Sequence, residues 1–112
     1  MNVEPDEHRR HLRYSVNEPC TADLEDGEHV GAVVNMSVSG AAVHLDVEFD
    51  AKLEPDTLVE LQVQRIGRVH TRVVRPLVDG MAVEFLFDPT QDRDMIARLW
   101  KVLNEYSPAA SH

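Results

Sequence analysis

The sequence predicts an all-β domain with one helix, in which six short antiparallel strands close into a barrel that is followed by a C-terminal α-helix. Three observations carry this prediction: apolar residues recur at every second position within several short runs between residues 20 and 85, glycines separate some of these runs, and the spacing becomes helical after residue 88. Alternation gives each strand one apolar face. Closing six such strands into a barrel buries those faces and leaves no exposed sheet edge.

The alternation is regular enough to predict which individual side chains point into the barrel and which point to solvent. Val59, Leu61 and Val63, for example, alternate with polar side chains, and His44 and His70 fall on the outward phase of their runs. The other inward positions are Cys20, Ala22, Leu24, Ala41, Val43, Leu45, Val47, Phe49, Val69, Thr71, Val73, Met81, Val83 and Phe85.

Turns are expected at Asp26-Gly27, Ile66-Gly67 and Asp79-Gly80, where each glycine can adopt a positive φ. We therefore expect consecutive strands to pair antiparallel.

A helix is predicted to begin at Asp88. This residue is suited to an N-cap, Pro89 to the first helical position and Gln91 to a capping box, and Ser107-Pro108 ends the run. We expect its apolar face to be buried against the barrel. That face comprises Met95, Ile96, Leu99, Trp100, Leu103 and Tyr106.

The chain divides into three parts. Residues 1–12 are nearly all polar or charged, which predicts a flexible N-terminal arm, residues 13–106 form the barrel with its helix, and residues 107–112 form a disordered tail. The length of 112 residues and the apolar content of 43 % fit one domain with a modest core.

Charge and composition exclude several classes of function. The formal net charge of −9 would repel a nucleic-acid polymer, although the basic residues are mostly Arg, which suits recognition of a small anion. Cys20 is the single cysteine, so the chain has neither an internal disulfide nor a multi-cysteine zinc site. With no apolar run near the roughly 18 residues that span a membrane, we expect no membrane insertion and a cytoplasmic protein.

Two motifs carry polar chemistry. Arg9 and Arg13 form an RxxxR pattern before the first strand, and in an extended chain they lie roughly 13 Å apart, far enough to engage two ends of one ligand. Asn35, Ser37 and Gly40 form an NxSxxG pattern between two strands, with short hydrogen-bonding side chains and a glycine that lets the backbone approach an anion. Taken singly, the first motif is better explained as a solvated basic patch and the second as a turn that merely reverses the chain.

Together, the two motifs within a six-strand pattern that ends in a helix resemble the PilZ domain family, as does the Gly80-Met81-Ala82-Val83-Glu84-Phe85 strand. The resemblance covers about Arg9 to Tyr106 and implies a single-domain receptor for cyclic di-GMP, with Asn35 standing where many members have Asp. The ligand-binding residues implied are Arg9, Arg10, Arg13, Asn35, Ser37 and Gly40.

The chemistry agrees, because guanidinium groups bind phosphates and the O6 and N7 atoms of guanine. The role of Arg10 stays open, since family members bind one ligand molecule or an intercalated pair. We expect ligand binding to change the conformation of the arm and its contact with an unidentified protein effector, in a monomer or a homodimer.

The alternative is a ligand-independent interaction module in motility or pilus machinery. No catalytic residues, cofactor or metal site are expected. His8 and His11 are near each other, but His29, His44 and His70 are scattered, and neither a metal-ligand spacing nor a catalytic triad nor a carboxylate pair is readable. Four arginines surround the predicted Ile66-Gly67 turn, and a solvated hairpin is the expectation for them, with a ligand or partner contact as the alternative. They are Arg65, Arg68, Arg72 and Arg75.

Overall fold

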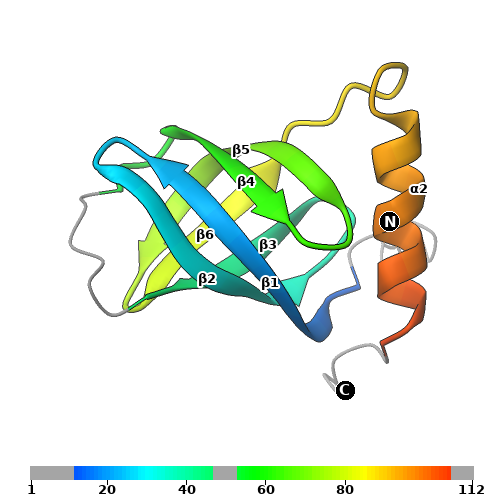
Figure 1. The fold of residues 1–112 in the computed structure, drawn as a ribbon, viewed down its shortest axis with the longest axis horizontal. Helices are drawn as coiled ribbons and strands as arrows, with labels where there is room; N and C mark the ends of the chain where they lie inside the picture. The colour runs from blue at the N-terminus through cyan, green and yellow to red at the C-terminus, as the bar shows by residue number, and fades with distance from the viewer. Residues whose placement is uncertain (1–11, 47–52, 107–112) are drawn as a thin grey trace, which may run out of the picture.

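The computed structural model describes residues 12–46 and 53–106, which form a closed antiparallel barrel and one helix (Figure 1). The strands are β1 (Tyr14–Leu24), β2 (Gly27–Met36), β3 (Gly40–Leu45), β4 (Leu58–Val63), β5 (Gly67–Leu77) and β6 (Gly80–Phe85), and the helix is α2 (Arg93–Asn104). Around the barrel the strands follow the order β1-β2-β3-β6-β5-β4, and β4 pairs with β1 to close it. The predicted fold class is confirmed.

The expectation that every pair of consecutive strands is hydrogen-bonded is wrong at one step. β3 pairs with β6, whereas β4 pairs with β1 and β5. The chain connects β3 to β4 through residues 46–57, a connection much longer than the tight turn that pairs strands locally. Val47 and Phe49, predicted to extend the third strand, lie outside the described residues.

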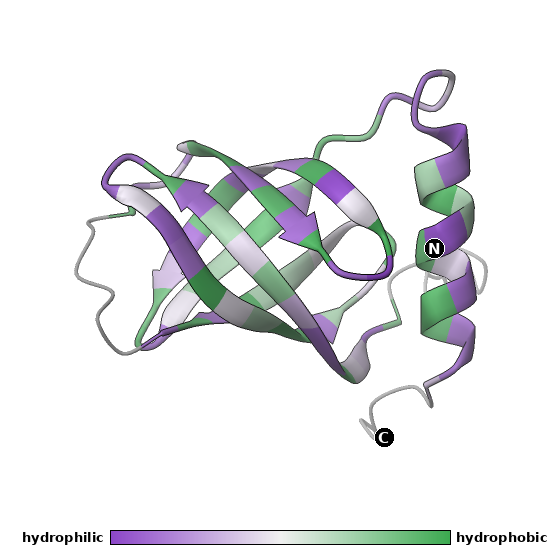
Figure 2. Ribbon diagram, in the orientation of Figure 1, coloured by the Kyte–Doolittle hydropathy of each residue, from purple (hydrophilic) through white to green (hydrophobic). Residues whose placement is uncertain are grey.

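The core lies inside the barrel, and the alternating colours along the strands in Figure 2 follow the inward and outward positions. On β6, Met81 and Val83 are buried whereas Glu84 is exposed. His44 and His70 are exposed, as their outward phase predicts. Each large apolar side chain buried in this way stabilises the fold by about 1.5 to 3 kcal/mol.

Two of the three predicted turn glycines have the expected backbone. Gly27 and Gly67 have φ angles of 123° and 118°. The positive φ expected for Gly80 is wrong, and another constraint explains the residue: a Cβ atom there would lie 1.8 Å from the carbonyl oxygen of Val43. Glycine at this position lets β6 pack closely against β3.

α2 begins later and ends earlier than the sequence predicts. Asp88 does cap a turn, since its Oδ1 accepts hydrogen bonds from the backbone N–H groups of Thr90 (2.8 Å) and Gln91 (3.0 Å). The backbone N–H of Asp88 in turn donates to Asp92 Oδ2 (2.8 Å). These side-chain bonds compete with a helical path over residues 89–92, so the helix starts at Arg93.

α2 stands across one end of the barrel (Figure 1) and closes it with Leu99, Val102 and Leu103, which are buried. Met95 and Tyr106 pack partly buried against the core. The predicted burial of Trp100 is wrong, because this side chain lies at the edge of the inward face and is 42 % exposed. No described helix has the length and apolar character needed to cross a membrane.

Candidate functional site

The predicted Asn35-x-Ser37-x-x-Gly40 motif spans the end of β2, a short loop and the start of β3. Ser37 is 1 % exposed, and its Oγ accepts a hydrogen bond from the backbone N–H of Ser39 (3.1 Å) and lies 3.1 Å from Ser39 Oγ. Its own backbone N–H donates to the carbonyl oxygen of Gly40 (2.9 Å). Ser37 therefore holds the loop in shape, and the exposed hydroxyl belongs to Ser39.

Gly40 has a packing reason to be glycine. A Cβ atom at this position would lie 2.3 Å from the carbonyl oxygen of Val83, a distance that real Cβ atoms do not tolerate. Gly40 pairs with Glu84 across β3 and β6. The glycine thus sets the close approach of these two strands beneath the motif.

Arg13 joins the first motif to the second. It directly precedes β1, and its Nε donates a hydrogen bond to Asn35 Oδ1 (2.5 Å). The fold therefore brings together two residues that are 22 positions apart in the sequence. Arg9 and Arg10 lie outside the described residues.

Beside this hydrogen bond lies a hollow of 780 Å³, which we call the candidate pocket. Its floor is the outer face of β3 and β6, where Ala42 and Ala82 are cross-strand neighbours. Asn35 pairs with Ala42 on one side, and Arg75 pairs with Ala82 on the other. Four adjacent strands thus present one row, with polar side chains at its ends and two methyl groups between them.

Two β-bulges create this row. On β2 the pairing steps from Val33–Val43 to Asn35–Ala42, and on β5 it steps from Val73–Val83 to Arg75–Ala82. In each case the outer strand, β2 or β5, has one more residue than the strand it pairs with over this step. The extra residue is Val34 on β2 and Val74 on β5. A bulge of this kind reverses the facing of the residues after it and re-aims a side chain. Asn35 and Arg75 consequently share a face with the alanines.

The charged groups of the candidate pocket favour an anion. Arg13, Arg75 and Glu84 line it, and the Glu84 carboxylate is occupied by an ion pair with Arg72. That ion pair raises the pKa of Arg72, which stays charged. A protein with a formal net charge of −9 thus has a locally positive surface here.

Sequence reasoning missed Ser39, and it gave Arg75 a ligand contact only as the alternative to a solvated hairpin. Ser39 occupies an unspecified position of the second motif, and only the burial of Ser37 draws notice to it. For Arg75 a signal does exist: the adjacent valines Val73 and Val74 break the period-two pattern, and such a break indicates a bulge.

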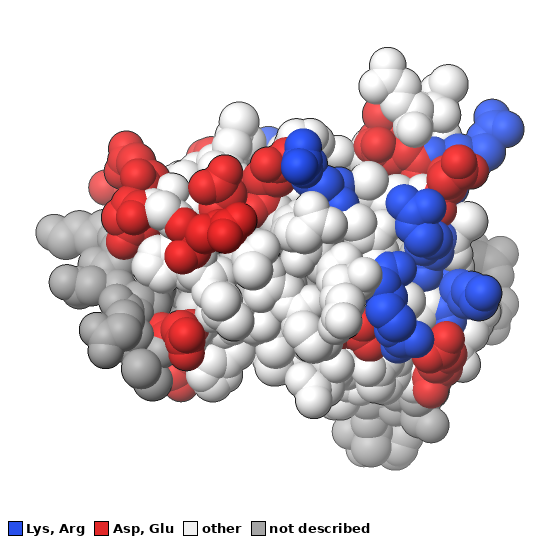
Figure 3. All heavy atoms as spheres, viewed as in Figure 1, with Lys and Arg blue, Asp and Glu red and all other residues white. Residues whose placement is uncertain are grey.

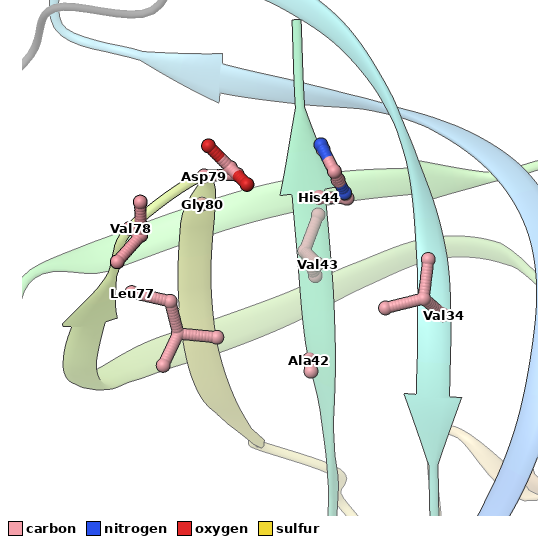
Figure 4. A pocket seen from close by; sticks show the side chains of 8 residues that line it. All are labelled: Val34, Ala42, Val43, His44, Leu77, Val78, Asp79 and Gly80. Carbon is pink, nitrogen blue, oxygen red and sulfur yellow. The ribbon is translucent and has the colours of Figure 1, made fainter.

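A second, apolar groove of 260 Å³ adjoins the candidate pocket and shares Ala42 and Leu77 with it. Figure 4 shows Leu77 and Val78 on one side of β3 and Val34 on the other, with His44 and Asp79 toward one end. Val78 is 98 % exposed. The outer face of the barrel therefore changes from positive to apolar along β3 and β6.

Two features of the described residues concern metal ligands and the thiol. Within residues 12–46 and 53–106, no group of three or more His, Cys, Asp or Glu side chains is placed to hold a metal ion. Cys20 is buried, and burial raises the pKa of its thiol to about 11, so that it stays protonated at neutral pH.

Comparison with known proteins gives a family match. The model of the PilZ domain matches residues 7–101, which is most of the chain and includes both motifs. No curated protein matches the chain by sequence.

Solved structures show the same fold. The PilZ domain of CeSA from a cellulose-synthesizing bacterium is similar, with a TM-score of 0.66 and 23 % identity over 83 % of this chain and 96 % of that one. The PilZ domain of YcgR from Escherichia coli, solved with c-di-GMP, has a TM-score of 0.59 and 20 % identity over 87 % and 92 %. The inhibitor of motility MotI of Bacillus subtilis has a TM-score of 0.61 and 17 % identity over 94 % of this chain and 52 % of that one.

Proposed function

Since the chain belongs to the PilZ domain family, we propose that it is a receptor that binds cyclic di-GMP in the candidate pocket and does not transform it. The observation that carries this proposal is the hydrogen bond from Arg13 to Asn35, which joins both motifs at the edge of a positive, alanine-floored hollow. The ligand has two phosphodiester charges and two planar guanines. Guanidinium groups suit both, and a floor of methyl groups suits the face of a base.

The motif residues take different parts in this proposal. Arg13 contacts the ligand directly, and Asn35 positions Arg13 while offering its own amide to the ligand. Ser37 and Gly40 act through the loop and the strand spacing that they maintain. Arg9 and Arg10 add positive charge from the arm, whose change on binding is the signal read by a protein effector.

Calorimetric titration with cyclic di-GMP tests the proposal. We expect saturable binding that weakens with added salt, and recovery of the ligand unchanged after incubation. Arg13→Ala should weaken binding by about 10-fold to 100-fold, because it removes a charge-assisted hydrogen-bond donor. The matched control is Arg93→Ala, which removes one exposed arginine from α2, outside the pocket. A wild-type protein that gives no binding signal would contradict the proposal.

One observation favours the second candidate, a ligand-independent interaction module. The groove of Figure 4 exposes apolar side chains of the kind that protein partners cover. In that case cyclic di-GMP would not bind at all, so the same titration separates the two functions.

A further inference from the structure

Arg75 occupies a position in the sheet that is equivalent to that of the motif residue Asn35. Each follows two valines, each lies at a β-bulge on a strand that flanks β3 and β6, and each is the cross-strand neighbour of a floor alanine. Without its bulge, β5 would direct Arg75 toward the core, because Val69, Thr71 and Val73 before it all face inward. The bulge is therefore what makes Arg75 available to the pocket.

The guanidinium of Arg75 is also unengaged, in contrast to its neighbours on the hairpin. Arg65 pairs with Glu18, Arg68 lies 3.6 Å from Glu60, and Arg72 pairs with Glu84. Within residues 12–46 and 53–106, no side chain forms an ion pair or hydrogen bond with the Arg75 guanidinium. An exposed cation that lines a pocket without a protein partner is free to bind a ligand.

We propose that Arg75 binds the second half of the cyclic dinucleotide by a bidentate contact to the O6 and N7 atoms of one guanine. This inference rests on the proposed function and adds a residue that neither motif contains. Asn35, to which Arg13 donates a hydrogen bond, lies on β2, whereas Arg75 on β5 lies three strand spacings away, roughly 14 Å across the sheet. The ligand itself has two equivalent guanine nucleotides, so its two halves can meet the two ends of the row.

The contact is assigned to a base rather than a phosphate because of what surrounds Arg75. Arg13 directly precedes β1 and supplies positive charge beside Asn35, at the other end of the row. Next to Arg75 the surface is the methyl group of Ala82 and the side chain of Leu77, which suit the face of a purine rather than a charged group. A planar guanidinium beside such a surface matches the Hoogsteen edge of guanine.

The test compares the affinity of cyclic di-GMP for Arg75→Ala, Arg75→Lys and Arg68→Ala, measured by calorimetry. Arg68 is the matched control, since it lies on the same strand, is exposed and is outside the pocket. We expect Arg75→Ala to weaken binding by about 10-fold to 100-fold. Arg75→Lys should recover only a small part of this loss, because an ammonium group lacks the planar pair of donors, and Arg68→Ala should bind as the wild type does. Both positions are exposed, so melting temperatures should stay within a few degrees of the wild type.

Each contrary result has a separate meaning. Wild-type affinity in Arg75→Ala, with weakened binding in Arg13→Ala, would overturn this inference and leave the proposed function standing. Wild-type affinity in Arg75→Lys would overturn the base contact, because a point charge would then suffice. Absence of binding by the wild-type protein would instead end the proposed function, and this inference with it.

Discussion

The two ends of the barrel differ in how their carboxylates are arranged. At the end that α2 covers, the Glu18 carboxylate is 2 % exposed and accepts hydrogen bonds from Arg65 Nε (3.1 Å) and Nη2 (2.7 Å) and from the Tyr106 hydroxyl (2.6 Å). Arg65 Nη1 also donates to Glu105 (2.5 Å), just beyond the helix. This cluster links β1, the β4–β5 turn and the C-terminal end of α2. The expectation that Arg65 is merely solvated is wrong.

At the opposite end, like charges lie side by side. Acidic side chains gather on the face of the barrel away from α2 in Figure 3. There, Asp23 on β1 is the cross-strand neighbour of both Glu28 on β2 and Glu60 on β4. Arg68 is the basic residue that lines the same surface.

The difference between the ends comes from solvent. A carboxylate buried under a helix needs compensating donors, because desolvation of an unpaired charge is costly. Exposed carboxylates repel each other weakly through water and salt, so the fold tolerates them. Stability should therefore be concentrated at the covered end, and variants at the two ends can test this expectation.

The largest effect is expected from the helix itself. Leu103 is fully buried, so Leu103→Ala should lower the free energy of unfolding by about 2 to 5 kcal/mol through lost burial and a cavity. Trp100→Ala, on the same helix but 42 % exposed, is the control and should cost clearly less. Urea unfolding followed by circular dichroism measures both. Equal losses would show that α2 does not seal the barrel.

A smaller loss is expected from the buried carboxylate. Glu18→Gln keeps the size of the side chain but removes the charge that Arg65 and Tyr106 contact, and should cost about 1.5 to 3 kcal/mol. Glu28→Gln at the other end removes an exposed carboxylate and serves as the control. A Glu18→Gln protein as stable as the wild type would contradict the assigned role of the cluster.

The same residue predicts a pH dependence. Hydrogen bonds from Arg65 hold the pKa of Glu18 below its ordinary value of 4.5, although burial acts in the opposite direction. Because the pKa is lower in the folded state, the contribution of Glu18 is complete above about pH 4.5 and is lost as the pH falls through the lowered value. The stability difference between wild type and Glu18→Gln should therefore shrink on acidification. Unfolding curves between about pH 7 and pH 3 check this, and a constant difference would argue against it.

The smallest effect has the opposite sign. Asp23→Asn relieves repulsion from Glu28 and Glu60 and should stabilise the fold by about 0.2 to 1 kcal/mol. The gain should diminish at high salt, where the repulsion is already screened. Thermal melting of the wild type and of Asp23→Asn at low and high salt concentrations measures this gain. Stabilisation that persists undiminished in high salt would point to a cause other than charge.

Much of the fold was predictable because it depends on local patterns. Alternation gave the inward residues of β4 and β6, and the change of period gave a helix after the last strand. The pairing of β3 with β6 was not predictable in the same way, since strand order depends on contacts between distant segments. The start of α2 was misplaced because the side chains of Asp88 and Asp92 bind backbone groups in a turn.

The site was predictable where residue identity alone decides the chemistry. Arg13 and Asn35 were predicted to belong to one site, and the structure places them in hydrogen-bond contact. The burial of Ser37 and the close packing at Gly40 depend on the path of the loop, which motif spacing does not give. Arg75 was expected in a solvated hairpin, with a ligand contact only as the alternative, because its place in the pocket depends on a bulge that the sequence analysis did not predict.

The two bulges also shift the alternation of inward and outward side chains along their strands. Side chains of a β-strand point alternately inward and outward. The extra residue on β2 or β5 therefore reverses the facing of the residues that follow it. If β5 kept Val74 in a regular pairing without the bulge, Arg75 would take the next inward position after Val73, and its guanidinium would point into the apolar interior. The bulge at the extra valine of each strand, Val34 or Val74, thus decides whether the next side chain is available for binding. Deletion of Val74 would remove the bulge and still leave Arg75 opposite Ala82, so homologous chains that lack this valine should keep an outward-facing residue at this place.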